Sequence, residues 1–296
     1  LRVHGRGAPP PVTAAATVSV TGLAIYPVKS MRGIPLSRAR LTPKGLEHDR
    51  RFMVTRQNGR FVTQRDMPQL ALIGAELDDR GVRLTAPEME PLCVPFERDG
   101  GAPAAVRIWG QECAAVDQGE TVARWLGAAL QSTDGLRLVA MSPGFERPQG
   151  KPAELGADTH TLFADAAPYL VASETSLAAL NNALENGGHA AVPMNRFRPN
   201  IVLTGLAAFA EHAAQKLVGP GYVLRLAHPC QRCVVTTIDQ ATGQPDPQRE
   251  PFRTLVRLNP VPDRPTMPAF GQNAALGDGA GALIRIGDTL VPDGAM

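Results

Sequence analysis

The chain has 296 residues, of which 44% are hydrophobic and 20% are charged, with 30 Lys and Arg against 28 Asp and Glu. This length is enough for two domains with buried cores, and the near-neutral balance gives no sign of a nucleic-acid or membrane partner. No apolar run reaches the roughly 20 residues that a membrane-spanning helix needs. Four cysteines are too few for a disulfide framework, so we expect a reducing, cytoplasmic setting.

Short strands dominate the first half of the sequence. Residues 1–17 contain prolines and an Ala run but lack the continuous apolar centre of a signal peptide, so we expect a disordered extension there. A hairpin signal, Asn58-Gly59, lies between two candidate strands, and a helix is expected over 119–129 with Val122, Leu126 and Leu130 on one face. Alternating and β-branched segments predict strands at 18–26, 39–42, 51–56, 60–64, 72–77, 81–86, 93–95, 105–109 and 112–116.

The second half combines strands with a few helices. A Pro/Gly-rich connector is expected over 142–158, and helices over 174–185, with Ser173 as the N-cap, and over 209–217. The sequence therefore predicts a mainly β (α+β) protein in two segments that meet near residues 132–158. Strands are predicted at 136–141, 168–172, 200–203, 222–226, 234–238 and 283–291.

Two of the four cysteines, Cys230 and Cys233, are separated by only two residues in a predicted strand-loop-strand turn. Arg232 lies between them and would favour an ionised sulfur, because a nearby cation stabilises a thiolate. A thiolate is a soft metal ligand or a nucleophile. The function is therefore expected to depend on the chemistry of these sulfurs.

Four kinds of chemistry are open to this pair. A zinc site usually needs four ligands; His228 offers a third, but Cys93 and Cys113 are isolated in the sequence. A thioredoxin-like dithiol lies at a helix N-terminus, whereas 234–238 has a strand pattern. The third possibility is a packed structural pair. The fourth is a single thiolate bound to the metal of a redox cofactor, and it requires other residues to hold the rest of the cofactor.

Three distant segments offer such residues. Lys29 and Ser30 lie in a turn after a strand, Arg50 lies at a strand start, and Arg198 and Asn200 lie just before another strand. Each segment alone is also typical of exposed turn residues. Cations that converge with Ser and Asn donors would suit a phosphate and a polar heterocycle.

The order of these motifs resembles that of MOSC-domain proteins. The Tyr-Pro-Val-Lys-Ser segment at 26–30, the Gly-x-x-x-Asp-Arg-x-x-Met segment at 45–53 and the segment at 62–70 are similar to the N-terminal β-barrel of that family. Arg-Phe-Arg-Pro-Asn-Ile at 196–201, the Cys-x-x-Cys segment and the closing strand are similar to the MOSC domain itself. The resemblance implies an N-terminal β-barrel-like domain at 18–135 and a MOSC β-barrel domain with a few helices at 136–296.

The resemblance also implies a cofactor. MOSC-domain proteins bind molybdenum cofactor (Mo-molybdopterin), and the most similar branch contains the mitochondrial amidoxime-reducing component and its bacterial relatives. Cys233 matches the molybdenum ligand, and Cys230 is expected to be a packed thiol behind it. Where some relatives offer hydroxyls, Ala166 and Ala167 could contribute backbone only. The positions expected to contact the cofactor are Lys29, Ser30, Arg50, Arg65, Ala166, Ala167, Arg198, Asn200, Gln231, Arg232 and Asn273.

By this resemblance the leading hypothesis is a molybdenum-dependent reductase of N-hydroxylated compounds. Four cysteines leave no set for an iron–sulfur cluster, so electrons are expected from a separate ferredoxin, flavodoxin or cytochrome b5-like protein. The membrane anchor of the mitochondrial relatives is not expected here. Two other hypotheses stay open: a cofactor carrier or sulfur-transfer protein, and a binding module that holds the cofactor without chemistry.

Overall fold

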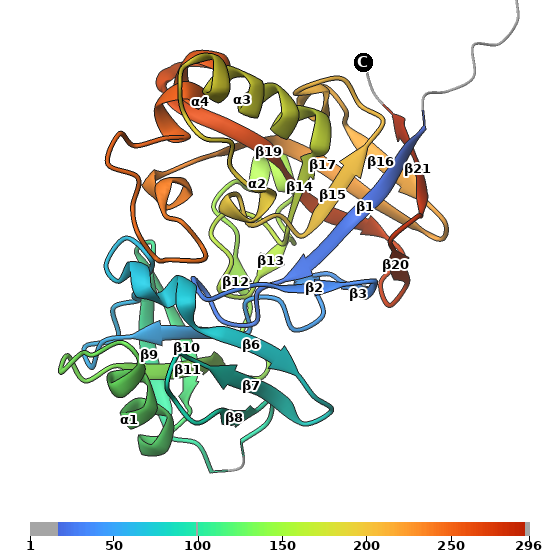
Figure 1. The fold of residues 1–296 in the computed structure, drawn as a ribbon. Coiled ribbons are helices and arrows are strands. Elements are labelled where there is room, and N and C mark those ends of the chain that lie inside the picture. The colour runs from blue at the N-terminus through green and yellow to red at the C-terminus, as the bar shows by residue number, and fades with distance from the viewer. Residues whose placement is uncertain (1–16, 99, 294–296) are drawn as a thin grey trace, which may run out of the picture.

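A closed seven-stranded barrel forms the larger part of the fold in the computed structural model, which describes residues 17–98 and 100–293 (Figure 1). Strands account for 40% of the chain and helices for 18%, so the predicted mainly β class is confirmed. In order around the barrel, the strands are β14 (Tyr169–Ser173), β15 (Ile201–Thr204), β1 (Val18–Ile25), β21 (Thr289–Asp293), β16 (Lys216–Gly219), β17 (Tyr222–Gln231) and β19 (Arg264–Asp278), which pairs again with β14.

Strand β1 fits this barrel because its sequence pattern contains one irregularity. Val18 and Val20 are buried, as are Leu23 and Ile25, so the spacing of two breaks once to three. The pairing with β15 shifts register between Val20 and Gly22, which is a β-bulge. A bulge adds one residue to a strand, so both pairs of side chains can face the same core.

The second core lies below the barrel in Figure 1, between two smaller sheets. Helix α1 (Glu120–Ala129) covers it with Val122 and Leu126, as predicted. One sheet contains β5 (Phe52–Thr55), β11 (Arg137–Met141), β10 (Gln111–Asp117) and β9 (Pro103–Ile108), and the other contains β6 (Gly74–Leu77), β7 (Gly81–Thr85) and β8 (Leu92–Pro95).

The remaining elements are short strands and helices outside the barrel and the two smaller sheets. Short ladders join β20 (Leu283–Arg285), β3 (Arg38–Thr42) and β4 (Gly45–Leu46), join β12 (Arg147–Pro148) to β13 (His160–Thr161), and attach β2 (Ile34–Leu36) and β18 (Pro260–Val261) to the barrel sheet. The other helices are α2 (Pro152–Leu155), α3 (Glu174–Asn186) and α4 (Phe252–Leu258), with short 3-10 helices η1 (Pro68–Leu72), η2 (Met194–Arg196), η3 (Ala210–His212) and η4 (Val234–Thr237).

The chain crosses from one core to the other just after β1. Ile25 is buried in the barrel core, whereas Val28 is buried in the second core. Lys29 therefore lies at the junction of the two cores. The predicted division at 18–135 and 136–296 stays a prediction, although β1, from the first segment, pairs with β15 and β21 from the second. The predicted disordered extension lies outside the described residues except for Thr17.

The prediction of a strand over 234–238 was wrong, because η4 occupies this segment. Thr236 Oγ1 donates to the Cys233 carbonyl at 2.9 Å, and Thr237 Oγ1 donates to the Val234 carbonyl at 2.8 Å. Such bonds from Thr side chains to nearby backbone compete with a strand ladder. The Cys-x-x-Cys turn therefore joins the end of β17 to a short 3-10 helix.

Five other predicted segments differ in detail. The helix expected over 209–217 is reduced to η3, because Phe209 has a left-handed φ of 62° and β16 begins at Lys216. Two predicted strands are shorter or weaker than expected: residues 60–64 form only isolated β-bridges, and residue 72 in the segment 72–77 still belongs to η1. The predicted connector at 142–158 contains β12 and α2. The predicted strand at 283–291 is divided into β20 and β21, with Gly287 between them. Ser173 does precede α3, but its hydroxyl makes no capping bond.

No helix among residues 17–98 and 100–293 is long and apolar enough to cross a membrane.

We predict that Gly271→Ala destabilises the seam where β14 closes the barrel onto β19. Gly271 has a φ of +72°, and an added Cβ would lie 2.6 Å from the Val171 carbonyl oxygen. Gly221→Ala is the matched control, because Gly221 has a φ of +85° with no atom within 4 Å of the added Cβ. In denaturant unfolding, the control should cost about 1 kcal/mol from backbone strain, and Gly271→Ala at least about twice that. Equal losses would contradict the proposed clash.

Candidate cofactor-binding site

A cavity of about 580 Å³ opens at the junction of the two cores. All twelve residues expected at the cofactor line it, although they come from seven separate parts of the chain. Lys29 and Ser30 lie in the turn after β1, and Arg65 follows the turn at Asn58-Gly59. The segments before β5, β14 and β15 contain Arg50, Ala166, Ala167, Arg198 and Asn200. Gln231 ends β17, Arg232 and Cys233 follow it, and Asn273 lies in β19.

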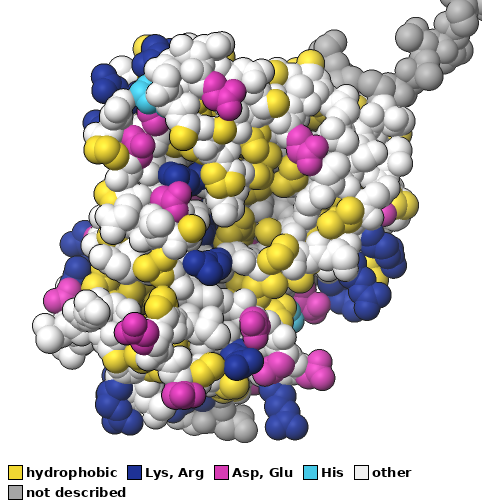
Figure 2. All heavy atoms as spheres, viewed as in Figure 1, with side chains coloured by type: hydrophobic (Ala, Val, Ile, Leu, Met, Phe, Trp, Pro, Cys, Tyr) yellow, Lys and Arg dark blue, Asp and Glu magenta, His cyan; other side chains and the backbone are white. Residues whose placement is uncertain are grey.

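The cavity is strongly cationic. Eight of the described residues that line it are Lys or Arg, and two are Asp. In Figure 2, dark blue Lys and Arg side chains lie in the hollow between the upper and lower parts of the molecule. Excess positive charge in a concave site attracts and orients an anion.

Tyr26 organises two of these cations. The Arg50 guanidinium lies 4.3 Å from the centre of the Tyr26 ring, and the Arg198 guanidinium lies 4.2 Å from it. Both contacts are cation–π interactions. The Tyr26 amide donates to Asp49 Oδ1 at 2.8 Å, and Arg50 donates to both Asp49 oxygens at 2.6 and 2.7 Å.

Arg198 has no such acidic partner. Its guanidinium makes no hydrogen bond with any residue that the structure describes. Burial lowers the pKa of Arg198 to about 10; the Tyr26 hydroxyl opposes this and the neighbouring Arg50 adds to it. An anion that enters the cavity would stabilise the charged form of this guanidinium, because its hydrogen bonds would replace the water that burial removes.

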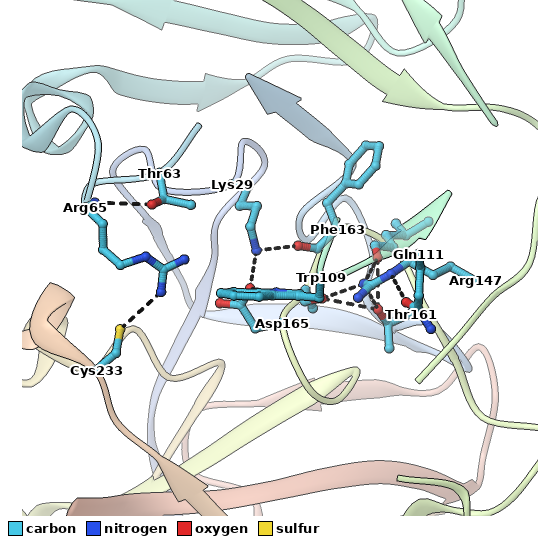
Figure 3. A network of polar contacts seen from close by, with 12 residues as sticks. Lys29, Thr63, Arg65, Trp109, Gln111, Arg147, Thr161, Phe163, Asp165 and Cys233 are labelled. Atoms are coloured by element: carbon cyan, nitrogen blue, oxygen red, sulfur yellow. Dashed lines mark hydrogen bonds and ion pairs between the residues drawn. The ribbon is translucent and has the colours of Figure 1, made fainter. Parts of the chain in front are cut away.

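Lys29 is held at the centre of a polar network (Figure 3). It is 4% exposed, and Nζ donates to the Phe163 carbonyl at 2.9 Å and to Asp165 Oδ1 at 2.5 Å. Burial lowers the pKa of Lys29, and Asp165 opposes this shift. Trp109 Nε1 donates to the same Asp165 oxygen at 2.7 Å.

The loop that presents Asp165 is fixed by Arg147, which is 3% exposed. One of its nitrogens donates to the carbonyls of Leu162 and Ala164 at 2.9 and 2.7 Å, and Nε donates to Gln111 Oε1 at 2.9 Å. Arg147 lies in the region that the sequence presented only as a connector. Its role as a loop clamp depends on distant carbonyls, so no local sequence signal indicated it.

The contacts of the two sulfurs differ from the expected ones. Arg232 donates to Cys230 Sγ at 2.8 Å rather than to Cys233. Cys233 instead accepts from Arg65, with 3.7 Å between Nη1 and Sγ (Figure 3). Cys230 and Cys233 are both half-buried, and the expected packing of Cys230 behind the metal ligand stays a prediction.

Two of the predicted residues serve the scaffold as well as the cavity. Asn200 donates to the Ala24 carbonyl at 3.2 Å and accepts from the Leu170 amide at 3.2 Å, so it ties β15 to both neighbouring strands. The distance between Asn273 Nδ2 and His228 Nδ1 is 3.2 Å. Their presence at the cavity was predicted, but these bonds were not.

Four cavity residues have left-handed backbone conformations that residues other than glycine rarely adopt. The φ angles are 69° at Ser30, 47° at Arg50, 55° at Arg198 and 62° at Asp263. Such conformations cost of order 1–3 kcal/mol each and gather at binding sites. This strain therefore marks the cavity independently of its charge.

A metal held by protein side chains alone is not indicated. In the described part of the chain, no three His, Cys, Asp or Glu residues lie together in an arrangement that could hold a metal ion. A metal bound through Cys233 would therefore take its other ligands from a cofactor.

Two family models match the chain, the MOSC N-terminal beta barrel domain over residues 17–133 and the MOSC domain over residues 158–291. The chain therefore belongs to the MOSC-domain proteins, as its motifs predicted. Among these it is 34% identical to mitochondrial amidoxime-reducing component 1 of Mus musculus, over 91% of this chain and 81% of that protein. It is 35% identical to the Homo sapiens protein of the same name and 33% identical to mitochondrial amidoxime reducing component 2 of Bos taurus, each over 80% of this chain and 71% of the relative.

The predicted cytoplasmic location is wrong by this comparison, because these relatives are named mitochondrial components. The prediction relied on the small number of cysteines and the lack of a long apolar run. Free thiols indicate a reducing compartment, but they do not specify which one.

We predict that Asp165→Asn destabilises the protein in a pH-dependent way. Partial loss of hydration inside the cavity alone would raise the pKa of Asp165, but Lys29 and the Trp109 donor outweigh it and hold that pKa below its ordinary value. The ionised carboxylate therefore stabilises the folded state above about pH 4, and this stabilisation is lost as the pH falls further. Because 65% of the side-chain surface faces the open cavity, we expect a loss of only about 1 kcal/mol at pH 7.

Urea unfolding of wild type and variant at pH 7 and pH 3 measures this difference. Asp134→Asn is the control, because Asp134 pairs with Arg56 at the surface and does not line the cavity. A loss for Asp165→Asn that is as large at pH 3 as at pH 7 would contradict the charge-based explanation.

Proposed function

We propose that this chain binds molybdenum cofactor in the cavity and reduces N-hydroxylated compounds such as amidoximes. The observation that supports this most directly is the cavity wall, where two thiols, Cys230 and Cys233, lie among eight cations and two acids. A soft sulfur suits molybdenum, and an excess of guanidinium and ammonium groups suits an anionic pterin phosphate. The names of the relatives support the substrate class and a mitochondrial rather than cytoplasmic location.

The residues present fit this cofactor. Arg198, which lacks an acidic partner, and its neighbour Arg50 would bind the phosphate, with Lys29 and Ser30 on the same wall. Gln231, Arg232, Asn200, Asn273 and the backbone of Ala166 and Ala167 would contact the pterin. When bound, the cofactor supplies two-electron redox chemistry.

The protein groups have separate tasks in this proposal. Cys233 provides the anchoring thiolate, and Arg65 donates to its sulfur. Asp165 fixes the Lys29 ammonium, so that this cation keeps its position while a substrate enters. Placing such groups before binding reduces the reorganisation that the reaction would otherwise need.

The net reaction requires an external reductant. Replacing N–OH by N–H releases one water and consumes two electrons and two protons. Cys93 and Cys113 do not line the cavity, and Cys230 and Cys233 do, so the four cysteines do not form one set that could hold an iron–sulfur cluster. We therefore propose that a separate ferredoxin, flavodoxin or cytochrome b5-like protein supplies the electrons.

We predict that Cys233→Ser loses cofactor-dependent reduction by at least about 100-fold, because a Ser hydroxyl is a poor ligand for a soft metal. Cys230→Ala is the matched control and should retain most activity, since Cys230 contacts Arg232 instead. Molybdenum content and benzamidoxime turnover with a chemical reductant are measured for both variants. The opposite ranking of the two variants would make Cys230 the ligand.

We predict that Arg198→Gln weakens cofactor retention roughly 10- to 100-fold, because a hydrogen bond to a charged group contributes about 1.5–3 kcal/mol. Arg253→Gln is the control, because Arg253 is exposed on α4 and does not line the cavity. Molybdenum and pterin released during gel filtration are quantified for each variant. Similar release from both variants would exclude Arg198 as a phosphate contact.

The function itself is tested on protein produced with a full supply of molybdenum. Stoichiometric molybdenum, pterin fluorescence after denaturation and amidoxime turnover are the expected results. Loaded protein that transfers its cofactor to an acceptor without reducing any N-hydroxylated compound would instead identify a carrier.

A further inference from the structure

Trp109 occupies an unusual position at the tip of the hairpin between β9 and β10. Ile108 pairs with Gln111, so Trp109 and Gly110 form a two-residue turn. Their φ angles of 50° and 83° are those of a type I′ turn. This turn favours Asn-Gly, and a bulky side chain at its first position has a steric cost.

Burial does little to offset this cost, because Trp109 is 49% exposed. Trp125, the other tryptophan, is 8% exposed in the second core and donates to the Glu90 carbonyl at 2.7 Å. Trp125 is thus an ordinary core indole. Trp109 is a large aromatic side chain that remains accessible in a strained turn.

Trp109 contacts two of the side chains that line the cavity. Its Nε1 donates to Asp165, which lines the cavity, and the Arg65 guanidinium lies 4.8 Å from the ring centre. Arg65 in turn donates to Cys233 (Figure 3). The Phe61 ring lies 5.1 Å away, tilted by 60°. These contacts fix the orientation of the indole while half of its surface stays open.

We propose that Trp109 is a substrate-binding residue whose indole stacks against the planar part of an aromatic amidoxime. This inference rests on the proposed function and deepens it by assigning a substrate class. Offset stacking of two π-systems adds to the free energy of area burial, and an aliphatic amidoxime lacks that second ring. The site would therefore favour aromatic over aliphatic N-hydroxylated substrates.

The test uses Trp109→Asn in the cofactor-loaded protein. Asn is favoured in the first position of this turn, so the variant should fold with an unchanged or higher melting temperature. We expect the KM for benzamidoxime, relative to that for acetamidoxime, to rise on the order of tenfold. Trp109→Phe keeps an aromatic ring and should restore most of this preference.

A second measurement does not depend on turnover. In a Trp125→Phe background, Trp109 is the remaining tryptophan, so its fluorescence reports directly on ligand contact. Without reductant, benzamidoxime should quench this emission with saturation, and acetamidoxime should not do so at the same concentration.

The outcomes separate the two proposals. Wild-type protein that contains molybdenum but reduces neither amidoxime would remove the proposed function and this inference with it. Wild-type turnover of both compounds, with no quenching and an unchanged KM ratio in Trp109→Asn, would overturn the role of Trp109 alone. A lower melting temperature for Trp109→Asn with an unchanged KM ratio would show that the indole only stabilises the hairpin.

Discussion

The antiparallel pairing of β1 with β15 is the constraint on which the cavity depends. Leu23 pairs with Ile201, so the end of β1 lies beside the start of β15. Tyr26, just beyond β1, then lies next to the residues that precede β15, and its hydroxyl donates to the Pro199 carbonyl at 3.2 Å. The two cations that stack on Tyr26 come from segments nearly 150 residues apart, and this pairing brings them together.

The cavity holds two like charges, Arg50 and Arg198, close together although they repel each other. Asp49 neutralises Arg50, but Arg198 remains close to it without an acid of its own, and burial already lowers the pKa of Arg198. Left-handed backbone at both residues adds conformational cost. Because an anion would relieve the repulsion only in the folded state, binding and folding stability are linked. The large barrel core supplies the stability that such an arrangement requires.

The sequence predicted the parts of this structure that depend on local patterns. The alternation before Pro27 defined β1, and the spacing of Val122 and Leu126 defined α1. The cavity residues were identified through motif resemblance, not through any pattern that reports distance. Chain proximity was misleading for the sulfurs, since residues two apart in an extended chain share a face. Arg232 therefore contacts Cys230, while Cys233 accepts a hydrogen bond from Arg65, which is 168 residues away in the sequence.

Two hairpins of this chain show how a broken local rule indicates function. Asn58-Gly59 uses residues that the turn itself favours, with Gly59 at a φ of 77°. Trp109-Gly110 does not, since the side chain at its first position is large, half exposed and bonded to a cavity residue. Natural sequences agree with their local structure except where another requirement outweighs it. At Trp109 the strand ladder is already satisfied by the pairing of Ile108 with Gln111, so the turn alone gives no reason for an indole. The contacts of the indole with Asp165 and Arg65, which line the cavity, point to the cavity as the source of this requirement.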